Sequence, residues 1–173
     1  MRSGIDRKLF ATALAGMLIA IAWLRPSIAA TQQALPTDLP TKKYLDLASI
    51  KTMVAGAETE AKKRNVEVSI CVVDESGNLL FLEKADAASI NSVQFAEKKA
   101  RQAALYGSPS KDAADSVKNG SVAFLTFPDY FPVQGGLPIK VDGRTIGAMA
   151  ASGAKSEVDE AIVQAGIDAR FRK

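Results

Sequence analysis

The sequence contains no histidine and only one cysteine, Cys71, among its 173 residues. The absence of histidine removes the commonest protein ligand of transition metals and the commonest general base. It also excludes a Ser-His-Asp triad. A single cysteine cannot form an intramolecular disulfide. We expect Cys71 to pack as a small core residue of a strand, because a reactive thiol needs exposure and a nearby cation.

The chain also has little excess charge once its first thirty residues are set apart. The formal net charge of the whole chain is +3, from 22 basic and 19 acidic residues. Residues 1–30 hold four of the basic residues and one acidic residue, so 18 of each sign remain. Phosphate binding needs a clustered positive surface. We therefore expect no nucleic-acid partner.

Residues 1–30 have the layout of a secretory signal peptide. A basic start is followed by an apolar run of sixteen residues, Leu9 to Leu24, and then by small residues that suit cleavage. The run is shorter than the ~20 residues of a spanning helix. We predict a periplasmic or secreted protein with no stable membrane span after cleavage; the alternative is an uncleaved anchor. Residues 31–43 would form a flexible leader and residues 44–173 one domain.

Hydrophobic periodicity predicts helices and two hairpins in the remaining chain. We expect helices over about 47–64, 91–105 and 111–118, and a last helix from 156. One hairpin is predicted at 66–84 and another around Asp142-Gly143. Residues 121–127 form a short strand, a hydrophobic loop or a turn of helix. This order indicates an α+β fold, with a mostly antiparallel sheet of about five strands and helices packed on it.

The stretch from Pro132 to Gly153 has unusually small side chains. We predict that one face of the return strand at 145–152 carries Ile146, Ala148, Ala150 and Ser152, and that the other carries Thr145, Gly147, Met149 and Ala151. Such small residues indicate that something large packs close to them. A helix, another subunit or a ligand would fit.

Several motifs follow one another in a set order. They are LDLA at 45–48, VSICVVDESGNLLFL at 68–82, SV at 92–93 with Ala96, Lys99, Ala100, Ala103, Tyr106 and Gly107, GGLPI at 135–139, GA at 147–148, SG at 152–153, DEA at 159–161 and AG at 165–166. In order and spacing, they resemble the GlcG/HbpS-like haem-binding family, also found as the C-terminal domain of PduO-type proteins. The resemblance covers about residues 44–170.

This resemblance implies an α+β domain that assembles into homo-oligomers and, in some members, binds haem. Secreted members are linked to haem and redox sensing, and those called GlcG occur beside glycolate use. The chain departs from the family where Asp86 replaces a glycine and Gln102 replaces a threonine. Residues 120–131 are also shorter and more aromatic than usual. The departures lie near the expected ligand side, so they bear on ligand identity.

Without histidine, the iron of a haem needs another axial donor. The chain offers tyrosines, methionines, Cys71 and lysines. Tyr130 is the candidate axial or stacking group, because Phe127 and Phe131 flank it and could meet the porphyrin faces. The alternative is that this aromatic loop packs on a neighbouring subunit. We expect Tyr106, at the end of an apolar helix, to pack rather than to ligate.

Charged groups and backbone N–H groups would bind the carboxylates of the ligand. Lys99 and Arg101 are the candidates for the propionates, and the N–H groups of Gly135 and Gly136 could hold the same anion. The alternative for Lys99 is a structural ion pair with an acidic residue of the last helix, Asp159 or Glu160.

Three functions follow from these observations. The first is a small-ligand-binding protein, for haem or a related tetrapyrrole, that acts in sensing or scavenging. The second is an enzyme or accessory protein for small carboxylates in 2-hydroxy-acid metabolism, with Lys99 and the glycine pair as the anion site. The third is an oligomeric interaction module without a ligand.

Overall fold

We analysed a computed structural model that describes residues 38 and 40–172. The predicted signal peptide, residues 1–30, lies outside the described residues, as does most of the predicted leader. The described part of the leader, residues 38 and 40–43, forms no helix or strand. No helix in the described ranges is both long and apolar enough to cross a membrane.

The domain has four strands in one antiparallel sheet, in the order β2-β1-β4-β3. Strands β1 (Ser69–Asp74) and β2 (Leu79–Lys84) form the first hairpin, and β3 (Gly136–Val141) and β4 (Arg144–Ser152) form the second. The predicted α+β class is confirmed. The sheet has one strand fewer than the expected five, because the ambiguous segment at 121–127 contains a 3-10 helix, η1 (Val122–Thr126).

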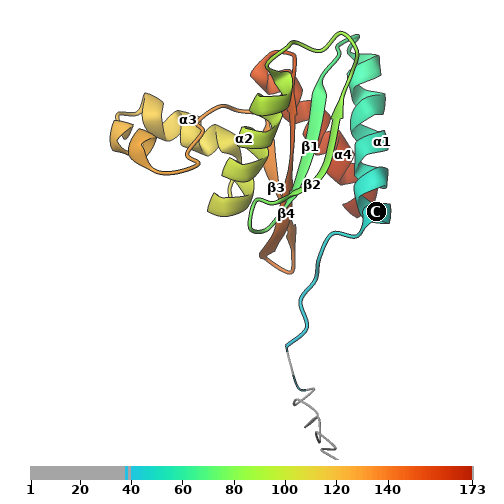
Figure 1. Cartoon of the computed structure of the whole chain (residues 1–173), viewed down its shortest axis with the longest axis horizontal. Helices are drawn as coiled ribbons and strands as arrows, with labels where there is room; N and C mark the ends of the chain where they lie inside the picture. Colours follow the sequence, from blue (N-terminus) through green and yellow to red (C-terminus); the bar gives the residue numbers. More distant parts are fainter. Residues whose placement is uncertain (1–37, 39, 173) are drawn as a thin grey trace, which may run out of the picture. The chain divides into compact units, whose positions relative to one another are not determined.

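Helices α1 (Leu47–Lys63) and α4 (Ser156–Phe171) cover one face of the sheet (Figure 1). Helix α1 begins as predicted, since the Asp46 carboxylate accepts a hydrogen bond of 2.8 Å from the Ser49 backbone N–H. The core on this face includes Met53, Ile139 and Ile162, all of them buried. This layer supports the sheet from the side away from the cavity described below.

Helix α2 (Ser92–Tyr106) covers the other face. Its small residues Ala96, Ala100 and Ala103 are fully buried against the sheet, which agrees with the close packing expected from the sequence. Cys71 is buried in β1 under this helix, and desolvation raises the pKa of its thiol to about 12. The expectation that Cys71 is a packed core residue is confirmed.

A bulge in β4 changes which residues face which layer. Ile139 pairs with Gly147 and Lys140 pairs with Thr145, so Ile146 is an extra residue in the ladder. Ile146 consequently shares the α1–α4 core with Met149, whereas Ala148 packs on the α2 side. The regular alternation predicted for 145–152 is wrong at Ile146, because it assumed an unbroken ladder.

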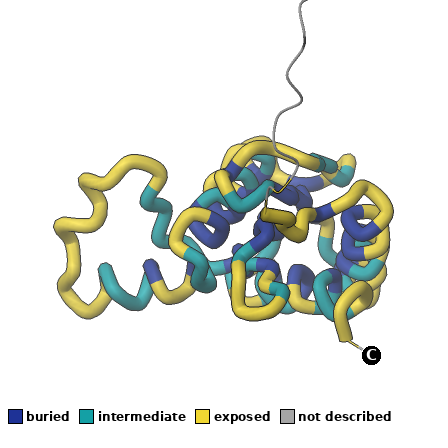
Figure 2. The backbone as a smooth tube through the Cα atoms, turned by 90° about the horizontal axis from the view of Figure 1, so that it is seen from below, coloured by how far each residue is buried: buried dark blue, intermediate teal, exposed yellow. Residues whose placement is uncertain are grey.

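Helix α3 (Ser110–Lys118) and η1 project from the body of the domain (Figure 1). We call residues 108–131 the arm. Figure 2 shows that most of the arm is exposed. Val122, Leu125 and Phe127 are at least half exposed, which is unusual for large apolar side chains that lie so close together.

Candidate functional site

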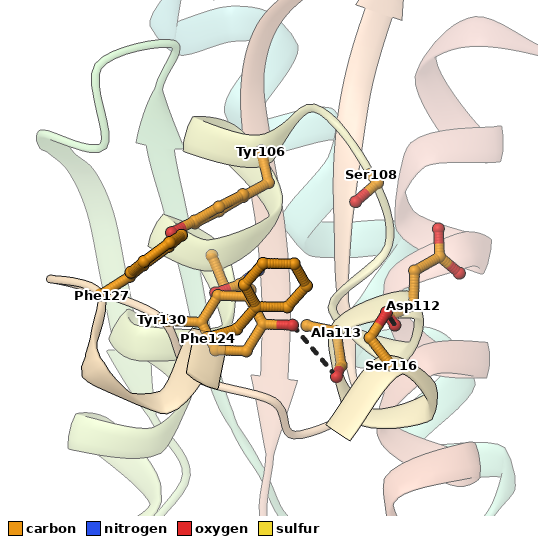
Figure 3. A pocket seen from close by; sticks show the side chains of 9 residues that line it. Tyr106, Ser108, Asp112, Ala113, Ser116, Phe124, Phe127 and Tyr130 are labelled. Carbon is orange, nitrogen blue, oxygen red and sulfur yellow. Dashed lines mark hydrogen bonds between the residues drawn. The ribbon is translucent and has the colours of Figure 1, made fainter. Parts of the chain in front are cut away.

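A cavity of about 190 Å³ lies between the C-terminal end of α2, helix α3 and η1 (Figure 3). Four aromatic side chains supply most of its apolar lining: Tyr106, Phe124, Phe127 and Tyr130. The α3 side of the cavity is polar, with the Asp112 carboxylate and two serine hydroxyls. The cavity is therefore apolar on the η1 side and polar on the α3 side.

The four rings pack edge to face or tilted against one another. The Tyr106 and Tyr130 ring centroids are 5.4 Å apart at 84°, and Phe124 lies 5.6 Å from Tyr130 and 5.5 Å from Phe127. Edge-to-face pairs are favourable because the positive edge of one ring meets the negative face of another. The cluster therefore holds aromatic surface at the cavity without burying it: Phe127 remains 50% exposed.

Two hydrogen bonds fix the segment that carries Tyr130. The Tyr130 hydroxyl donates to the Ala113 carbonyl of α3 at 3.2 Å. The Phe131 backbone N–H donates to Gln102 Oε1 at 2.8 Å, and Gln102 is buried in α2. The glutamine that departs from the family pattern thus anchors the end of the arm to α2 while it also lines the cavity.

Phe131 does not line the cavity. Its ring packs edge to face on Phe95 of α2 at 5.5 Å, and the Lys98 ammonium lies 5.4 Å from the Phe131 ring centroid. Phe131 thus packs on the surface of α2, although its neighbour in the chain, Tyr130, lines the cavity. Of the three aromatic residues predicted to meet the ligand, the structure brings Phe127 and Tyr130 to the cavity but not Phe131.

Arg101 connects two loops on the α2 side of the sheet. It donates to the Gly77 carbonyl at 2.7 Å and to both oxygens of Asp129, at 3.2 Å and 3.0 Å. Hydrogen bonding to Asp129 raises the pKa of Arg101 and lowers the pKa of Asp129. About a third of the Arg101 side chain is exposed, so its guanidinium is accessible although already paired.

Lys99 lies in the interior with its charge satisfied. Its ammonium donates to Asp159 Oδ2 at 2.8 Å and to the Ala151 carbonyl at 3.1 Å, and both side chains of the ion pair are 2% exposed. Burial raises the pKa of Asp159, an effect that Lys99 opposes. This is the structural ion pair that the sequence offered as the alternative role of Lys99.

The glycine pair lies directly against this lysine. A Cβ atom on Gly135 would come within 2.8 Å of Lys99 Nζ, and one on Gly136 within 2.4 Å of the Lys99 carbonyl oxygen. The Gly136 N–H is already bound to the buried Ser110 hydroxyl at 2.9 Å. Lys99, Gly135 and Gly136 therefore form one buried group, separate from the lining of the aromatic cavity. The hypothesis of a small-carboxylate site there gains no support, because the Lys99 ammonium is already paired with the Asp159 carboxylate.

Sequence reasoning missed Tyr106, Phe124 and Asp112 as cavity residues. Tyr106 ends α2, and Gly107 then turns the chain with φ 62°, so the ring points out of the helix end toward η1. Phe124 was missed because the sequence left the structure of residues 121–127 undecided between a strand, a loop and a turn of helix. An i,i+3 spacing of Phe124 and Phe127 was the one available signal, because it places both rings on the same side of a 3-10 turn.

Comparisons with known proteins agree on one family. A sequence model of the family described as "Haem degrading protein HbpS-like" matches residues 45–168. Protein GlcG of Escherichia coli is 37% identical over 114 residues, which cover 66% of this chain and 85% of GlcG. A 15.0 kDa uncharacterized protein from the dhaT-dhaS intergenic region of Citrobacter freundii is 30% identical over 128 residues, covering 72% of this chain and 90% of that protein.

Solved structures share the fold. HbpS of Streptomyces reticuli, crystallised as a double mutant, superposes with a TM-score of 0.70 and 26% identity, over 78% of this chain and 92% of that chain. PduOC, crystallised as a complex with heme, superposes with a TM-score of 0.68 and 25% identity, over 73% of this chain and 95% of that chain.

Proposed function

The chain belongs to the HbpS-like family, and from this premise we propose that it binds haem or a related planar tetrapyrrole at the aromatic cavity between α2, α3 and η1. The observation that carries the proposal is the cluster of four aromatic rings around one cavity on the projecting arm. A flat, largely apolar macrocycle needs aromatic or aliphatic surface on its faces.

The donor set of the cavity fits haem without histidine. Tyr106 and Tyr130 are phenols, and tyrosine is one of the side chains that hold haem iron in proteins. When bound, haem would supply iron-centred redox chemistry to the site. The residues of this chain would bind and orient it. Lys98, whose ammonium lies against the Phe131 ring, and the partly exposed Arg101 are cations on α2 that suit the propionates.

The size of the cavity limits how much of the ligand one chain encloses. Pockets for drug-sized ligands and cofactors have volumes of about 300–1,000 Å³, whereas this cavity has about 190 Å³. One edge of the macrocycle would enter the cavity, and the rest would lie against exposed apolar side chains such as Phe127. This arrangement suits reversible binding in sensing or scavenging, the roles that we propose.

Titration of the full chain with ferric haem tests the proposal. We expect a Soret band that saturates at micromolar haem, and an affinity about five-fold weaker in Phe127→Ala, from the loss of about 1 kcal/mol of aromatic contact. Phe171→Ala is the matched control, since Phe171 is a partly exposed aromatic on α4 that should not matter. The absence of any spectral change at micromolar haem would remove the proposal.

We also propose that the protein is periplasmic or secreted, with residues 1–30 removed as a signal peptide. The support is the sequence pattern alone: a basic start, a short apolar run and a small-residue cleavage point. N-terminal sequencing of the protein isolated from its native cells tests this. A mature chain that begins close to residue 31 is the expected result, and a chain that retains Leu9 to Leu24 would contradict it.

A further inference from the structure

Resting on the proposed function, we infer that Tyr106, rather than Tyr130, is the side chain that coordinates the iron of a bound haem. The sequence favoured Tyr130 for this role and expected Tyr106 to pack. Both rings line the same cavity and lie 5.4 Å apart. The distinction between them therefore rests on their hydroxyl groups and on how firmly each is held.

The Tyr130 hydroxyl already has a structural partner. It donates to the Ala113 carbonyl at 3.2 Å and thereby ties the returning end of the arm to α3 (Figure 3). Coordination of iron by Tyr130 would break this hydrogen bond and leave the Ala113 carbonyl without that donor. Tyr130 also packs against two other rings, those of Tyr106 and Phe124. These contacts give Tyr130 a structural role in the wall of the cavity.

The Tyr106 hydroxyl is available. It has no hydrogen-bond partner among the residues that the structure describes, and 42% of the residue is exposed while its ring lines the cavity. A phenol with a free hydroxyl at an open cavity can meet a metal without the loss of an existing contact. This is the arrangement expected of a donor that acts only when the ligand is present.

Helix α2 also holds Tyr106 more firmly than the arm holds Tyr130. Three alanines of α2 are fully buried against the sheet, and Tyr106 is the last residue of this helix, before the C-cap Gly107. Tyr130 belongs to an irregular segment of the arm and follows Asp129, which has φ 59°. A metal donor needs a fixed position, and side chains on regular elements are placed more accurately than those on loops.

The chemistry is a proton-coupled ligand exchange without electron transfer. Tyr106 Oη would replace a water molecule bound to ferric haem: the phenol O–H bond breaks and its proton passes to solvent, the Fe–O bond to Tyr106 forms, the displaced water leaves to solvent, and the iron stays ferric. The edge-to-face contact with Tyr130 at 84° keeps the Tyr106 ring in position. Tyr130 is accordingly a positioning residue in this assignment.

Four substitutions in the full, untagged chain separate the two tyrosines. With ferric haem, we expect the resonance Raman bands of iron-bound phenolate in the native chain and in Tyr130→Phe, and their loss in Tyr106→Phe. We also expect haem affinity to fall at least ten-fold in Tyr106→Phe and only a few-fold in Tyr130→Phe. The native chain has no histidine, so Tyr106→His should give an imidazole-ligated spectrum that can arise only at position 106, and Tyr130→His should not.

Each outcome decides between the alternatives. Phenolate bands that persist in Tyr106→Phe and vanish in Tyr130→Phe would overturn the assignment to Tyr106, while haem binding itself would stand. A native chain that binds haem without phenolate bands would overturn it too. A native chain that binds no haem would remove the proposed function and this inference together. Because both Phe variants keep the ring, matching unfolding midpoints will show that any spectral loss comes from the hydroxyl.

Discussion

The ion pair between Lys99 and Asp159 joins three segments of the fold at one buried point. Lys99 comes from α2, Asp159 from the first turn of α4, and the Ala151 carbonyl that also accepts from Lys99 belongs to β4. The second Asp159 oxygen accepts from the Ala154 N–H at 3.0 Å. With both charges 2% exposed, neither can turn to water if its partner is lost.

Asp159→Asn should therefore destabilise the domain strongly. The substitution leaves the Lys99 ammonium buried without a counter-charge, which typically costs about 3–5 kcal/mol. Urea unfolding followed by circular dichroism measures the change. Asp115→Asn is the matched control, because Asp115 pairs with Lys111 on the exposed face of α3 and should cost less than about 1 kcal/mol. Equal losses in the two variants would refute the structural role of the pair.

The sequence identified Lys99 as a candidate residue but did not decide between a ligand-binding and a structural role. A lysine at that position was compatible with a ligand carboxylate and with an acidic residue of the last helix. The choice depends on whether the start of α4 meets α2 at the C-terminal end of β4, which is a long-range contact between residues 60 positions apart. Tyr106 shows the same limit, since its place at the cavity depends on where the arm returns.

At the scale of elements, the arm is fastened to the body by a few contacts at its returning end. These are the Arg101–Asp129 ion pair and the Gln102–Phe131 hydrogen bond, both made to α2. The Tyr130–Ala113 hydrogen bond then ties the same segment, residues 129–131, to α3 within the arm. The wall of the cavity at Tyr130 thus depends on the order of this short segment.

The Arg101–Asp129 pair makes the order of this segment dependent on pH. Hydrogen bonding to Arg101 lowers the pKa of Asp129 below its ordinary value of 3.8. A carboxyl group whose pKa is lower in the folded state stabilises that state above its unfolded-state pKa. The contribution is therefore complete above pH 4 and is lost as the pH falls through the lowered value. The pair is partly exposed, so it is worth at most about 1 kcal/mol.

Asp129→Asn isolates this charge, because asparagine tolerates the left-handed backbone found at Asp129. We expect the amides of residues 129–131 to exchange up to about five-fold faster in the variant at pH 5. The difference should shrink as the pH falls below 4, because Asp129 then becomes protonated in the native chain. Amides of α1 serve as the internal control. An unchanged exchange rate at pH 5 would show that the pair does not hold the segment.

The helices and hairpins could be predicted because their signals are local. Asp46 capped α1 as expected, and Asp142-Gly143 formed the expected turn, where both residues have positive φ. The bulge at Ile146 could not be predicted, since it depends on how β4 pairs with β3. The sequence of β4 alone does not show it. The 3-10 helix η1 was one of three open interpretations, because the apolar run at 122–125 is too short to show a period.

At the scale of the whole molecule, the apolar surface of the arm extends beyond the cavity. Val122 and Leu125 are 59% and 52% exposed, and neither lines the cavity. Contiguous apolar side chains on a projecting element are typical of protein–protein contacts. This supports the proposal, made first from the family resemblance, that copies of the chain associate.

Light scattering of the purified full chain tests this association. We expect a mass of at least two chains, and a shift toward the monomer mass in Leu125→Glu, because the substitution places a charge in the apolar contact. Leu47→Glu is the matched control, since Leu47 is similarly exposed on α1, on the other face of the sheet. A monomeric native chain, or equal masses for the two variants, would count against association through the arm.

NMR with ferric haem tests most directly whether a tetrapyrrole binds at the aromatic cavity of the arm. Paramagnetic iron broadens the amide signals nearest to it, and a gallium porphyrin provides the diamagnetic control. We expect the broadening to centre on residues 106–130 and to leave α1 and α4 unaffected. Broadening centred on the α1–α4 face, or on the buried group around Lys99, would contradict it.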